Sequence, residues 1–406
     1  MLIETNEVKA LIVNLESELS ATKEWSDVSY KMKCVFLYND DIQLSNWKMH
    51  VNPSSGFVKK ENKFSANREI KYALNHLMLP SSNVAYIVLN VLELKDAAQQ
   101  GLGTILVNNT QITKEHLGYL PDIILYNVSD IIDAIESKSG FFAEVLATKL
   151  SSNNNSSSRF VLTLLTRSAN LIICGRYFGK GHPNSEIHQL SQRLLRSKND
   201  ATQNQIFVEI LSYELGRINN NLGKIDGVTR VPARPESRDR LGEVITIACK
   251  ATEFSNYNDC LVCVEDFPKQ KDFSNLDERA FNVRGKFKVN MDVKGKHIIL
   301  VDDVYTTGAT LKECYSELIA KGALKITAVV FAVNQFPLVF TRKMPAECSK
   351  CGNDFKMRLR KDGTVMFFGC SSYPDCTHTV DFEEGWYKFN EKNQIKVDIQ
   401  DFDITF

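Results

Sequence analysis

Short apolar runs recur along this chain, separated by longer segments of mixed polarity, and this alternation constrains the fold more than any other feature. The runs before residue 150 indicate buried strands, and residues 67–78 and 94–100 between them have helical patterns. Strands that alternate with helices predict a parallel sheet with helices on both faces. The five runs are Ala10–Leu15, Cys34–Asn39, Ala85–Asn90, Thr104–Asn109 and Asp122–Asn127.

The middle of the chain shows the same alternation, with apolar runs at residues 228–233, 245–250, 260–264, 297–304 and 326–333. We therefore expect an α/β fold with two doubly wound parallel-sheet domains in tandem. A tract of Ser and Asn can bury nothing and indicates a linker. The expected division is a first domain at 1–150, the linker at 151–158, a second domain at 159–342, a small cysteine-containing unit at 343–381 and an acidic tail at 382–406.

Charge and hydropathy exclude two classes of function. Lys and Arg together number 49, and so do Asp and Glu, so a basic field over the whole protein is excluded. Nucleic acid could bind only at a local basic patch. No apolar run approaches the roughly 18 residues of a membrane-spanning helix, and the first residues carry two Glu and no cationic leader. We expect a soluble, cytoplasmic protein without a membrane partner.

The strongest chemical signal is the segment His297–Thr310, which reads HIILVDDVYTTGAT. An apolar strand ends in two adjacent carboxylates, Asp302 and Asp303, and a loop of small residues leads into an amphipathic helix. Backbone N–H groups at a helix N-terminus bind phosphate, and the threonine hydroxyls of the loop add donors. The acidic pair can hold two vicinal sugar hydroxyls, directly or through Mg²⁺ and water. An acidic turn that only caps the helix is the alternative.

This segment resembles the phosphoribosyl-pyrophosphate (PRPP) motif of type I phosphoribosyltransferases, and of their ComF-like members in particular. Two upstream stretches, Thr229–Arg240 and Leu276–Val289, also resemble ComF-like sequences, so that the resemblance covers residues 159–342. It implies a central parallel sheet, PRPP as the substrate and a requirement for Mg²⁺. The acceptor stays open, because ComF-like chains have no clear acceptor signature.

The same resemblance assigns roles to individual residues. Asp302 and Asp303 would bind the ribose hydroxyls, and Arg279, Arg284 and Lys286 would belong to a mobile basic loop that closes over the leaving group. For each of these basic residues, plain surface solvation is the alternative. The 5′-phosphate would be held by Thr306, Thr307, Gly308, Ala309 and Thr310, and the pyrophosphate by Ala233 and Arg234.

Four of the ten cysteines lie within 29 residues near the C-terminus, in two pairs. Cys348 and Cys351 have two residues between them, and Cys370 and Cys376 have five. Four thiolates on two short loops suit a closed, tetrahedral structural Zn²⁺ site, which would stabilise a unit too small to build its own core. A redox disulfide is the alternative.

The residues around these cysteines resemble the C-terminal zinc ribbon of bacterial type I topoisomerases, notably in the Gly-Cys-Ser-x-Tyr-Pro-x-Cys stretch. Residues 341–363 carry seven Lys or Arg against three acidic residues, with aromatic residues interleaved. Basic groups contact phosphates and aromatic rings stack on bases, so single-stranded DNA or RNA is the expected ligand, unless the aromatic residues only pack the ribbon. The candidate nucleic-acid residues are Lys350, Phe355, Lys356, Arg358, Arg360, Phe367, Phe368 and Tyr373.

Residues 10–136 resemble a degenerate haloacid-dehalogenase (HAD) domain. Where HAD phosphatases carry Asp-x-Asp after the first strand, this chain has Asn14 and Glu16, and a later acidic position is Asn90. An amide cannot serve as the aspartyl nucleophile. We therefore expect phosphatase activity to be lost and the domain to be structural or to dock a protein partner.

Two functions of different classes follow from these patterns. The first is an Mg²⁺-dependent phosphoribosyltransferase with a zinc ribbon that binds nucleic acid. The second is a PRPP or nucleotide sensor without turnover, in DNA uptake, DNA processing or phage defence. Two smaller motifs carry no chemistry in this interpretation: Cys260 and Cys263 belong to a buried strand, and the loop Tyr177–His188 caps the helix that follows.

Overall fold

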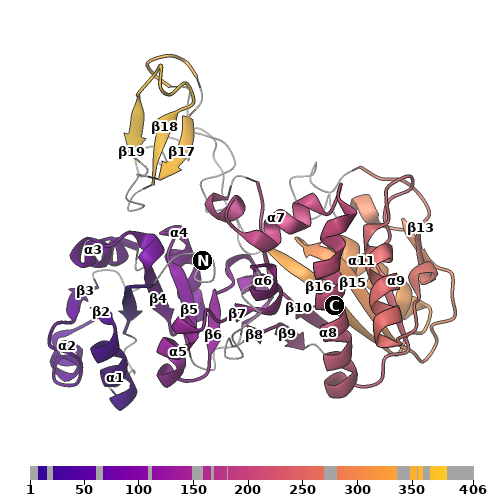
Figure 1. Cartoon of the computed structure of the whole chain (residues 1–406), viewed down its shortest axis with the longest axis horizontal. Coiled ribbons are helices and arrows are strands. Elements are labelled where there is room, and N and C mark those ends of the chain that lie inside the picture. Colours follow the sequence, from indigo (N-terminus) through magenta and orange to yellow (C-terminus); the bar gives the residue numbers. More distant parts are fainter. Residues whose placement is uncertain are drawn as a thin grey trace.

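The computed structural model of the chain shows two α/β domains and a small antiparallel sheet (Figure 1). None of the helices it describes is long and apolar enough to cross a membrane. It describes residues 8–15, 22–60, 67–107, 112–148, 159–165, 169–180, 182–268, 281–335, 348–353, 355–359 and 366–381.

The first sheet has the strand order β3-β2-β1-β4-β5-β6, and every neighbouring pair in it is parallel. All five apolar runs predicted before residue 150 are strands of this sheet, which confirms the doubly wound fold. The strands are β1 (Ala10–Asn14), β2 (Lys33–Tyr38), β3 (Gly56–Lys59), β4 (Val84–Val88), β5 (Gly103–Val107) and β6 (Ile123–Leu125). The helices are α1 (Lys23–Lys31), α2 (Asp41–Lys48), α3 (Asn67–Leu77), α4 (Leu94–Gln99) and α5 (Ile131–Glu136), with a 3₁₀ turn η3 (Lys114–Tyr119) before β6.

The second sheet has the order β12-β15-β16-β10-β9, and β11 continues the line of β10 along β16. Its pairs are parallel except that the edge strand β9 is antiparallel. The strands are β9 (Leu162–Leu165), β10 (Ala169–Ile173), β11 (Arg176–Phe178), β12 (Gly227–Arg230), β15 (His297–Tyr305) and β16 (Lys325–Gln335).

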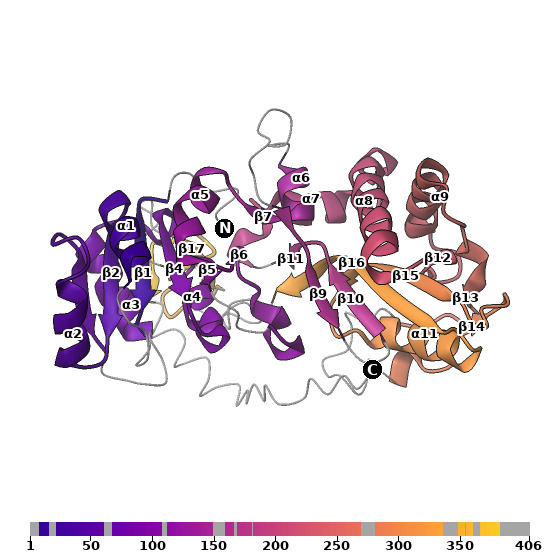
Figure 2. The ribbon, with the colours of Figure 1, turned by 90° about the horizontal axis from the view of Figure 1, so that it is seen from below.

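Helices cover both faces of this sheet (Figure 2). One face packs on α7 (Gln189–Arg196), α8 (Asn204–Leu222) and α9 (Arg240–Thr252), and the other packs on α11 (Ala309–Ala320). The alternate residues of β15 divide between the two cores, since Ile298 and Leu300 pack on one side and Ile299 and Val301 on the other. A strand buried on both faces has the continuous apolar sequence from which it was predicted.

One predicted strand is a helix, and another is a strand that lies outside the main sheet. Residues 245–250 lie in α9, where Ile245, Ala248 and Cys249 are buried on one helical face and Ile247 is half exposed. Such spacing is that of a helix, and the apolar content alone did not reveal it. Residues 260–264 contain β13 (Leu261–Cys263), which pairs with the antiparallel β14 (Phe287–Val289) in a separate two-stranded sheet.

A short connection joins the two domains. Strand β7 (Gly140–Phe141) pairs with β8 (Arg159–Phe160), and helix α6 (Phe142–Ala147) between them packs on α7 and α8. The residues of α6 thus precede the predicted boundary at residue 150 but contribute to the core of the second sheet. The boundary itself stays a prediction.

The cysteine-containing unit is a three-stranded antiparallel sheet. It consists of β17 (Phe355–Leu359), β18 (Met366–Cys370) and β19 (Thr379–Asp381), with β18 in the middle. Two tight turns, one before β17 and one after β18, present the four cysteines.

Candidate functional site

The acidic pair lies at the carboxyl end of β15, between β12 and β16. Both side chains are half-buried. Burial and the adjacent Asp303 carboxylate together raise the pKa of Asp302 to about 8. Asp303 instead forms an ion pair with the Arg240 guanidinium. Of the two carboxylates, Asp303 is thus the one that forms an ion pair with a described residue.

Arg240 is a site residue that sequence reasoning missed. It begins α9, is 7% exposed, and reaches across to Asp303. Its second Nη atom donates to the Ser197 hydroxyl at 3.0 Å, and its guanidinium lies 5.5 Å from the centre of the Phe207 ring. These contacts hold the guanidinium, so that Asp303 is oriented from the α9 side of the sheet. The basic residues of the segment 229–240 were the only sequence signal.

The loop after the acidic pair has the shape of an anion cradle. Gly308 has φ +74°, and a Cβ atom placed on it would lie 2.7 Å from the buried Tyr305 ring, so only glycine fits. The helix α11 starts directly after it, and the Lys312 N–H donates to the Gly308 carbonyl at 2.7 Å. First-turn N–H groups of a helix have no acceptor within the helix and point at the loop. Thr306, which is exposed, and the half-buried Thr307 and Thr310 flank them.

The predicted pyrophosphate loop lies beside this cradle. Strands β12 and β15 are parallel neighbours, and the Val231 N–H donates to the Val301 carbonyl at 2.9 Å, so the residues after β12 follow the same sheet edge. Ala233 and Arg234 are half-buried there. Arg234 donates to the Phe267 carbonyl at 3.1 Å and lies 3.9 Å from Asp266, which leaves part of its guanidinium exposed.

The basic residues expected in a mobile loop have different surroundings. Arg284 is exposed, whereas Lys286 forms an ion pair with Glu265. The turn between them contacts α11, since the Gly285 N–H donates to Glu313 Oε1 at 2.7 Å. Arg279 lies outside the described residues. The structure thus brings the turn that carries Arg284 and Lys286 to the helix that starts at the cradle.

The four predicted zinc ligands come together. Their sulfur atoms all lie within 4.8 Å of one another, with Cys348 and Cys376 3.7 Å apart and Cys351 and Cys370 3.3 Å apart. A Zn–S bond of about 2.3 Å in a tetrahedron requires sulfur atoms roughly 3.8 Å apart, so the four thiols fit Zn²⁺. All four are free thiols, which excludes the disulfide alternative in this structure.

One further side chain contacts the cluster. His378 Nδ1 lies 3.2 Å from Cys348 Sγ, close enough to donate to the thiolate. Sequence reasoning missed His378, because zinc-ribbon spacing is recognised from the cysteines alone.

The strand register shows which of the predicted nucleic-acid residues of the ribbon lie opposite one another. In the antiparallel register of β17 and β18, Lys356 pairs with Gly369 and Arg358 pairs with Phe367, whereas Phe355 pairs with the predicted ligand Cys370. Lys350 and Tyr373 are exposed in the two cysteine turns, and Arg360 lies outside the described residues. The strand register thus brings basic and aromatic residues of β17 and β18 opposite one another, and it places Phe355 opposite a predicted zinc ligand.

In the first domain the end of β1 is occupied by an amide and a lysine. Asn14 is 4% exposed, accepts from Lys60 Nζ at 2.6 Å, and donates to Glu93. An ammonium group thus lies beside the residue that the HAD resemblance aligns with the nucleophile. Asn90 follows β4 at the same sheet edge, and Glu16 lies outside the described residues.

The loop Tyr177–His188 has the predicted role. His188 is the N-cap of α7, and its side chain accepts from the Ser191 N–H at 3.2 Å. Cys260 is buried and Cys263 is half-buried, as a structural strand requires.

Comparisons with known proteins agree with this geometry. Residues 270–358 match the model of the phosphoribosyl transferase domain, and residues 346–385 match the topoisomerase DNA-binding C4 zinc finger. The resemblances to a phosphoribosyltransferase and to the topoisomerase zinc ribbon are confirmed by these matches. The DNA utilization protein YhgH of Escherichia coli is 38% identical over 48 residues, which are 12% of this chain and 21% of YhgH. The chain thus spans about a fifth of the length of the curated relatives it matches.

Solved structures with similarity to the chain come from both expected groups. A haloacid dehalogenase-like hydrolase from Streptococcus pneumoniae is 14% identical, with 27% of this chain and 55% of that chain covered and a TM-score of 0.23. A purine phosphoribosyltransferase from Pyrococcus horikoshii is 17% identical, with 36% and 83% covered and a TM-score of 0.22.

Proposed function

We propose that this protein is an Mg²⁺-dependent phosphoribosyltransferase that uses PRPP, with a zinc ribbon that binds single-stranded nucleic acid. One observation carries the first part: a buried parallel strand ends in an acidic pair, and a glycine-dependent loop and a helix N-terminus follow it directly. In this assignment the loop residues 306–310 hold the 5′-phosphate, and Asp302 and Asp303 hold the ribose hydroxyls.

The reaction needs little covalent chemistry from the protein. The bond between C1′ and the pyrophosphate oxygen breaks with its electron pair on pyrophosphate, and a nucleophilic atom of the acceptor forms the new bond to C1′ and loses its proton to water. Mg²⁺, when bound, supplies positive charge to the leaving group, and the two carboxylates are the oxygen ligands it prefers. Arg234, Arg284 and Lys286 add positive charge on the side where pyrophosphate leaves. The protein's contribution is orientation and exclusion of water.

The test is calorimetric binding of PRPP in the presence of Mg²⁺, combined with an assay for released pyrophosphate. We expect wild-type protein to bind and the double variant Asp302→Asn/Asp303→Asn to lose binding. Asp292→Asn is the matched control, because Asp292 is exposed in the turn at the opposite end of β15. Equal binding by wild type and the double variant would rule out the assignment.

Pyrophosphate release decides between an enzyme and a sensor. Release that appears with an added base or oligonucleotide would identify the acceptor class. Tight binding without release under every condition would instead favour the sensor, in which the ribbon brings a PRPP-responsive domain to nucleic acid. A reducing, cytoplasmic compartment suits either function, because the four thiols hold zinc only when reduced.

For the ribbon we propose that Lys356, Arg358 and Phe367, which lie on the paired strands β17 and β18, contact the nucleic acid. A labelled single-stranded oligonucleotide, followed by fluorescence anisotropy at several salt concentrations, tests this. Each phosphate contact contributes about −0.7 to the slope of log K against log salt for single strands, so Lys356→Gln/Arg358→Gln should make the slope less negative by about 1.4. Lys294→Gln/Lys321→Gln, with both residues exposed in the second domain, is the control. An unchanged slope in Lys356→Gln/Arg358→Gln would exclude these residues as nucleic-acid contacts.

A further inference from the structure

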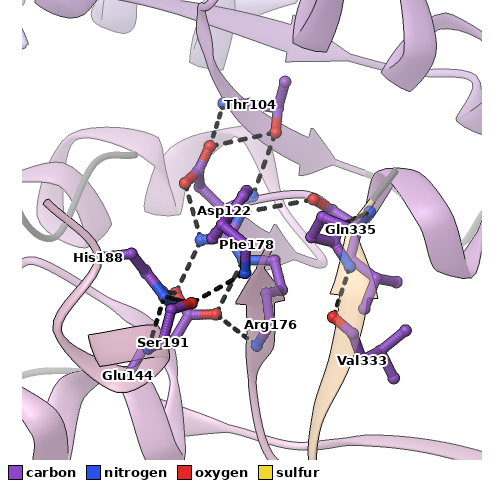
Figure 3. A network of polar contacts seen from close by, with 10 residues as sticks. Thr104, Asp122, Glu144, Arg176, Phe178, His188, Ser191, Val333 and Gln335 are labelled. Atoms are coloured by element: carbon purple, nitrogen blue, oxygen red, sulfur yellow. Dashed lines mark hydrogen bonds and ion pairs between the residues drawn. The ribbon is translucent and has the colours of Figure 1, made fainter. Parts of the chain in front are cut away.

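Strand β11 is fixed to the first domain by a buried ionic cluster (Figure 3). Arg176 is 3% exposed. Its guanidinium donates to both oxygens of Glu144 in α6, at 2.8 and 2.7 Å, and to Asp122 Oδ1 at 2.9 Å. Asp122 directly precedes β6 of the first sheet, and its other oxygen accepts from the Thr104 N–H at 2.8 Å. One arginine of the second sheet is therefore held by carboxylates from the first domain and from the connection.

A second contact holds the neighbouring strand at the same level. Gln335 ends β16 and is 4% exposed. Its amide donates to the Leu117 carbonyl at 3.0 Å, and its oxygen accepts from the Leu120 N–H at 2.8 Å, both in or next to η3 of the first domain. Strands β11 and β16 thus reach the carboxyl edge of the second sheet with their ends bound to the first domain.

Tyr177 lies on this anchored strand between Arg176 and Phe178, which are both buried. Successive residues of a strand lie on opposite faces, so Tyr177 is on the other face from Arg176. It is half-buried and packs on the core of the α7–α9 side, as Val304 does. Burial and the Asp303 carboxylate raise the pKa of Tyr177, which agrees with a phenol near the acidic pair.

The order of the strands defines the position of Tyr177 relative to the proposed PRPP site. The pyrophosphate loop follows β12, on one side of β15, and β16 and β11 lie on the other side. Tyr177 pairs in register with Asn334, one residue beyond the level at which Val333 pairs with Tyr305. A nucleophile that displaces pyrophosphate in line attacks C1′ from the side opposite the leaving group. In the proposed PRPP complex this is the side toward β16 and β11, and Tyr177 lies on β11.

We propose that Tyr177 contacts the acceptor group and that Arg176 is its positioning residue, so that the first domain acts as the rigid support of the acceptor side. This inference rests on the proposed PRPP site and adds the residue that faces a planar, base-like acceptor. The first domain then contributes to transfer by holding β11 in place, without chemistry of its own.

Two probes separate the acceptor side from the phosphate cradle. Ribose 5-phosphate fills only the cradle and the acidic pair, whereas AMP and UMP also carry a base on C1′. We expect the nucleotides to bind the full chain more tightly than ribose 5-phosphate does. Tyr177→Ala should weaken nucleotide binding about tenfold, within the 1–3 kcal/mol of an aromatic contact with a base, and leave ribose 5-phosphate unchanged. Tyr177→Phe keeps the ring and should bind nucleotides like wild type.

The positioning role is tested by Arg176→Lys, which keeps the charge and loses the planar fork. It should also weaken nucleotide binding and spare ribose 5-phosphate. The double variant with Tyr177→Ala should be no weaker than Tyr177→Ala alone, because Arg176 acts through Tyr177. Asp133→Asn, at an exposed residue of α5, is the control.

The outcomes are distinguishable. No binding of ribose 5-phosphate to wild type would overturn the PRPP site and this inference with it. Normal ribose 5-phosphate binding with nucleotide affinity unchanged in Tyr177→Ala would overturn this inference alone. Additive losses in the double variant, or equal loss of both probes in Arg176→Lys, would overturn the positioning role of Arg176.

Discussion

Replacement of Glu144 by Gln tests the ionic cluster between the domains. Glu144 is buried against Arg176, with 2% of its side chain exposed. Burial alone would raise the pKa of this carboxyl, but the Arg176 guanidinium outweighs burial and lowers the pKa from 4.5 to about 2. A carboxyl with a pKa depressed by folding stabilises the folded state above its unfolded pKa, and this contribution is lost as the pH falls through the folded pKa.

The magnitude follows from the size of the pKa shift. A shift of one unit corresponds to about 1.4 kcal/mol, so the shift of Glu144 contributes about 3 kcal/mol to the free energy of unfolding at pH 7. At pH 3 the carboxyl is almost fully protonated in the unfolded state and still mostly ionised in the folded state. The contribution of Glu144 to the free energy of unfolding is then about 1.4 kcal/mol. The difference in stability between wild type and Glu144→Gln should therefore shrink by about 2 kcal/mol between pH 7 and pH 3.

The assay is urea unfolding of both proteins at pH 7, 5 and 3, followed by far-ultraviolet circular dichroism. Glu186→Gln serves as the control, because Glu186 is exposed and should show no difference from wild type at any of these pH values. A difference between wild type and Glu144→Gln that is the same at pH 7 and pH 3 would refute the reasoning, since it would mean that Glu144 has an ordinary pKa in the folded protein.

Three further variants test the sites. Gly308→Ala should lower stability by about 1–2 kcal/mol and abolish PRPP binding in calorimetry, because alanine is strained at φ +74° and its Cβ would clash with Tyr305; full binding would contradict this. Arg240→Met should weaken PRPP binding about tenfold, by loss of a charged hydrogen bond to Asp303, and an unchanged affinity would count against that role. Cys370→Ser should reduce zinc, measured by elemental analysis, below one ion per chain, whereas Cys263→Ser should retain it; equal zinc content would refute the four-cysteine site.

The parts of the site that were predictable are those in which neighbouring residues act together. The strand, the acidic pair, the loop glycine and the helix start are continuous in sequence, so their geometry follows from local rules. The zinc cysteines lie on two tight turns of fixed spacing, which is nearly as local. In both cases the chemistry requires few contacts from distant elements.

The residues that were missed depend on distant contacts. Arg240 meets Asp303 across 63 positions of sequence, and Arg176 meets Asp122 across 54. An arginine in a polar segment resembles any surface arginine until the fold buries it. The prediction of a strand at residues 245–250 was wrong for a related reason. The apolar content of this run fits a strand or a helix, and only packing on the second sheet decides between them.

The ionic cluster also indicates what the first domain contributes to the protein. Burial of two carboxylates and a guanidinium gains little stability over an apolar contact of similar size, because desolvation offsets most of the attraction. The Arg176 cluster nevertheless fixes the relative orientation of the elements that it joins, since a bidentate guanidinium tolerates only a narrow range of carboxylate positions. An apolar interface would let the domains slide by fractions of an ångström. The strand that this interface holds carries Tyr177, and in the proposed transfer reaction such shifts would change the alignment of the reacting atoms. In the proposed transfer reaction, a domain with Asn14 and Lys60 at the end of its first strand would thus serve as a precise support.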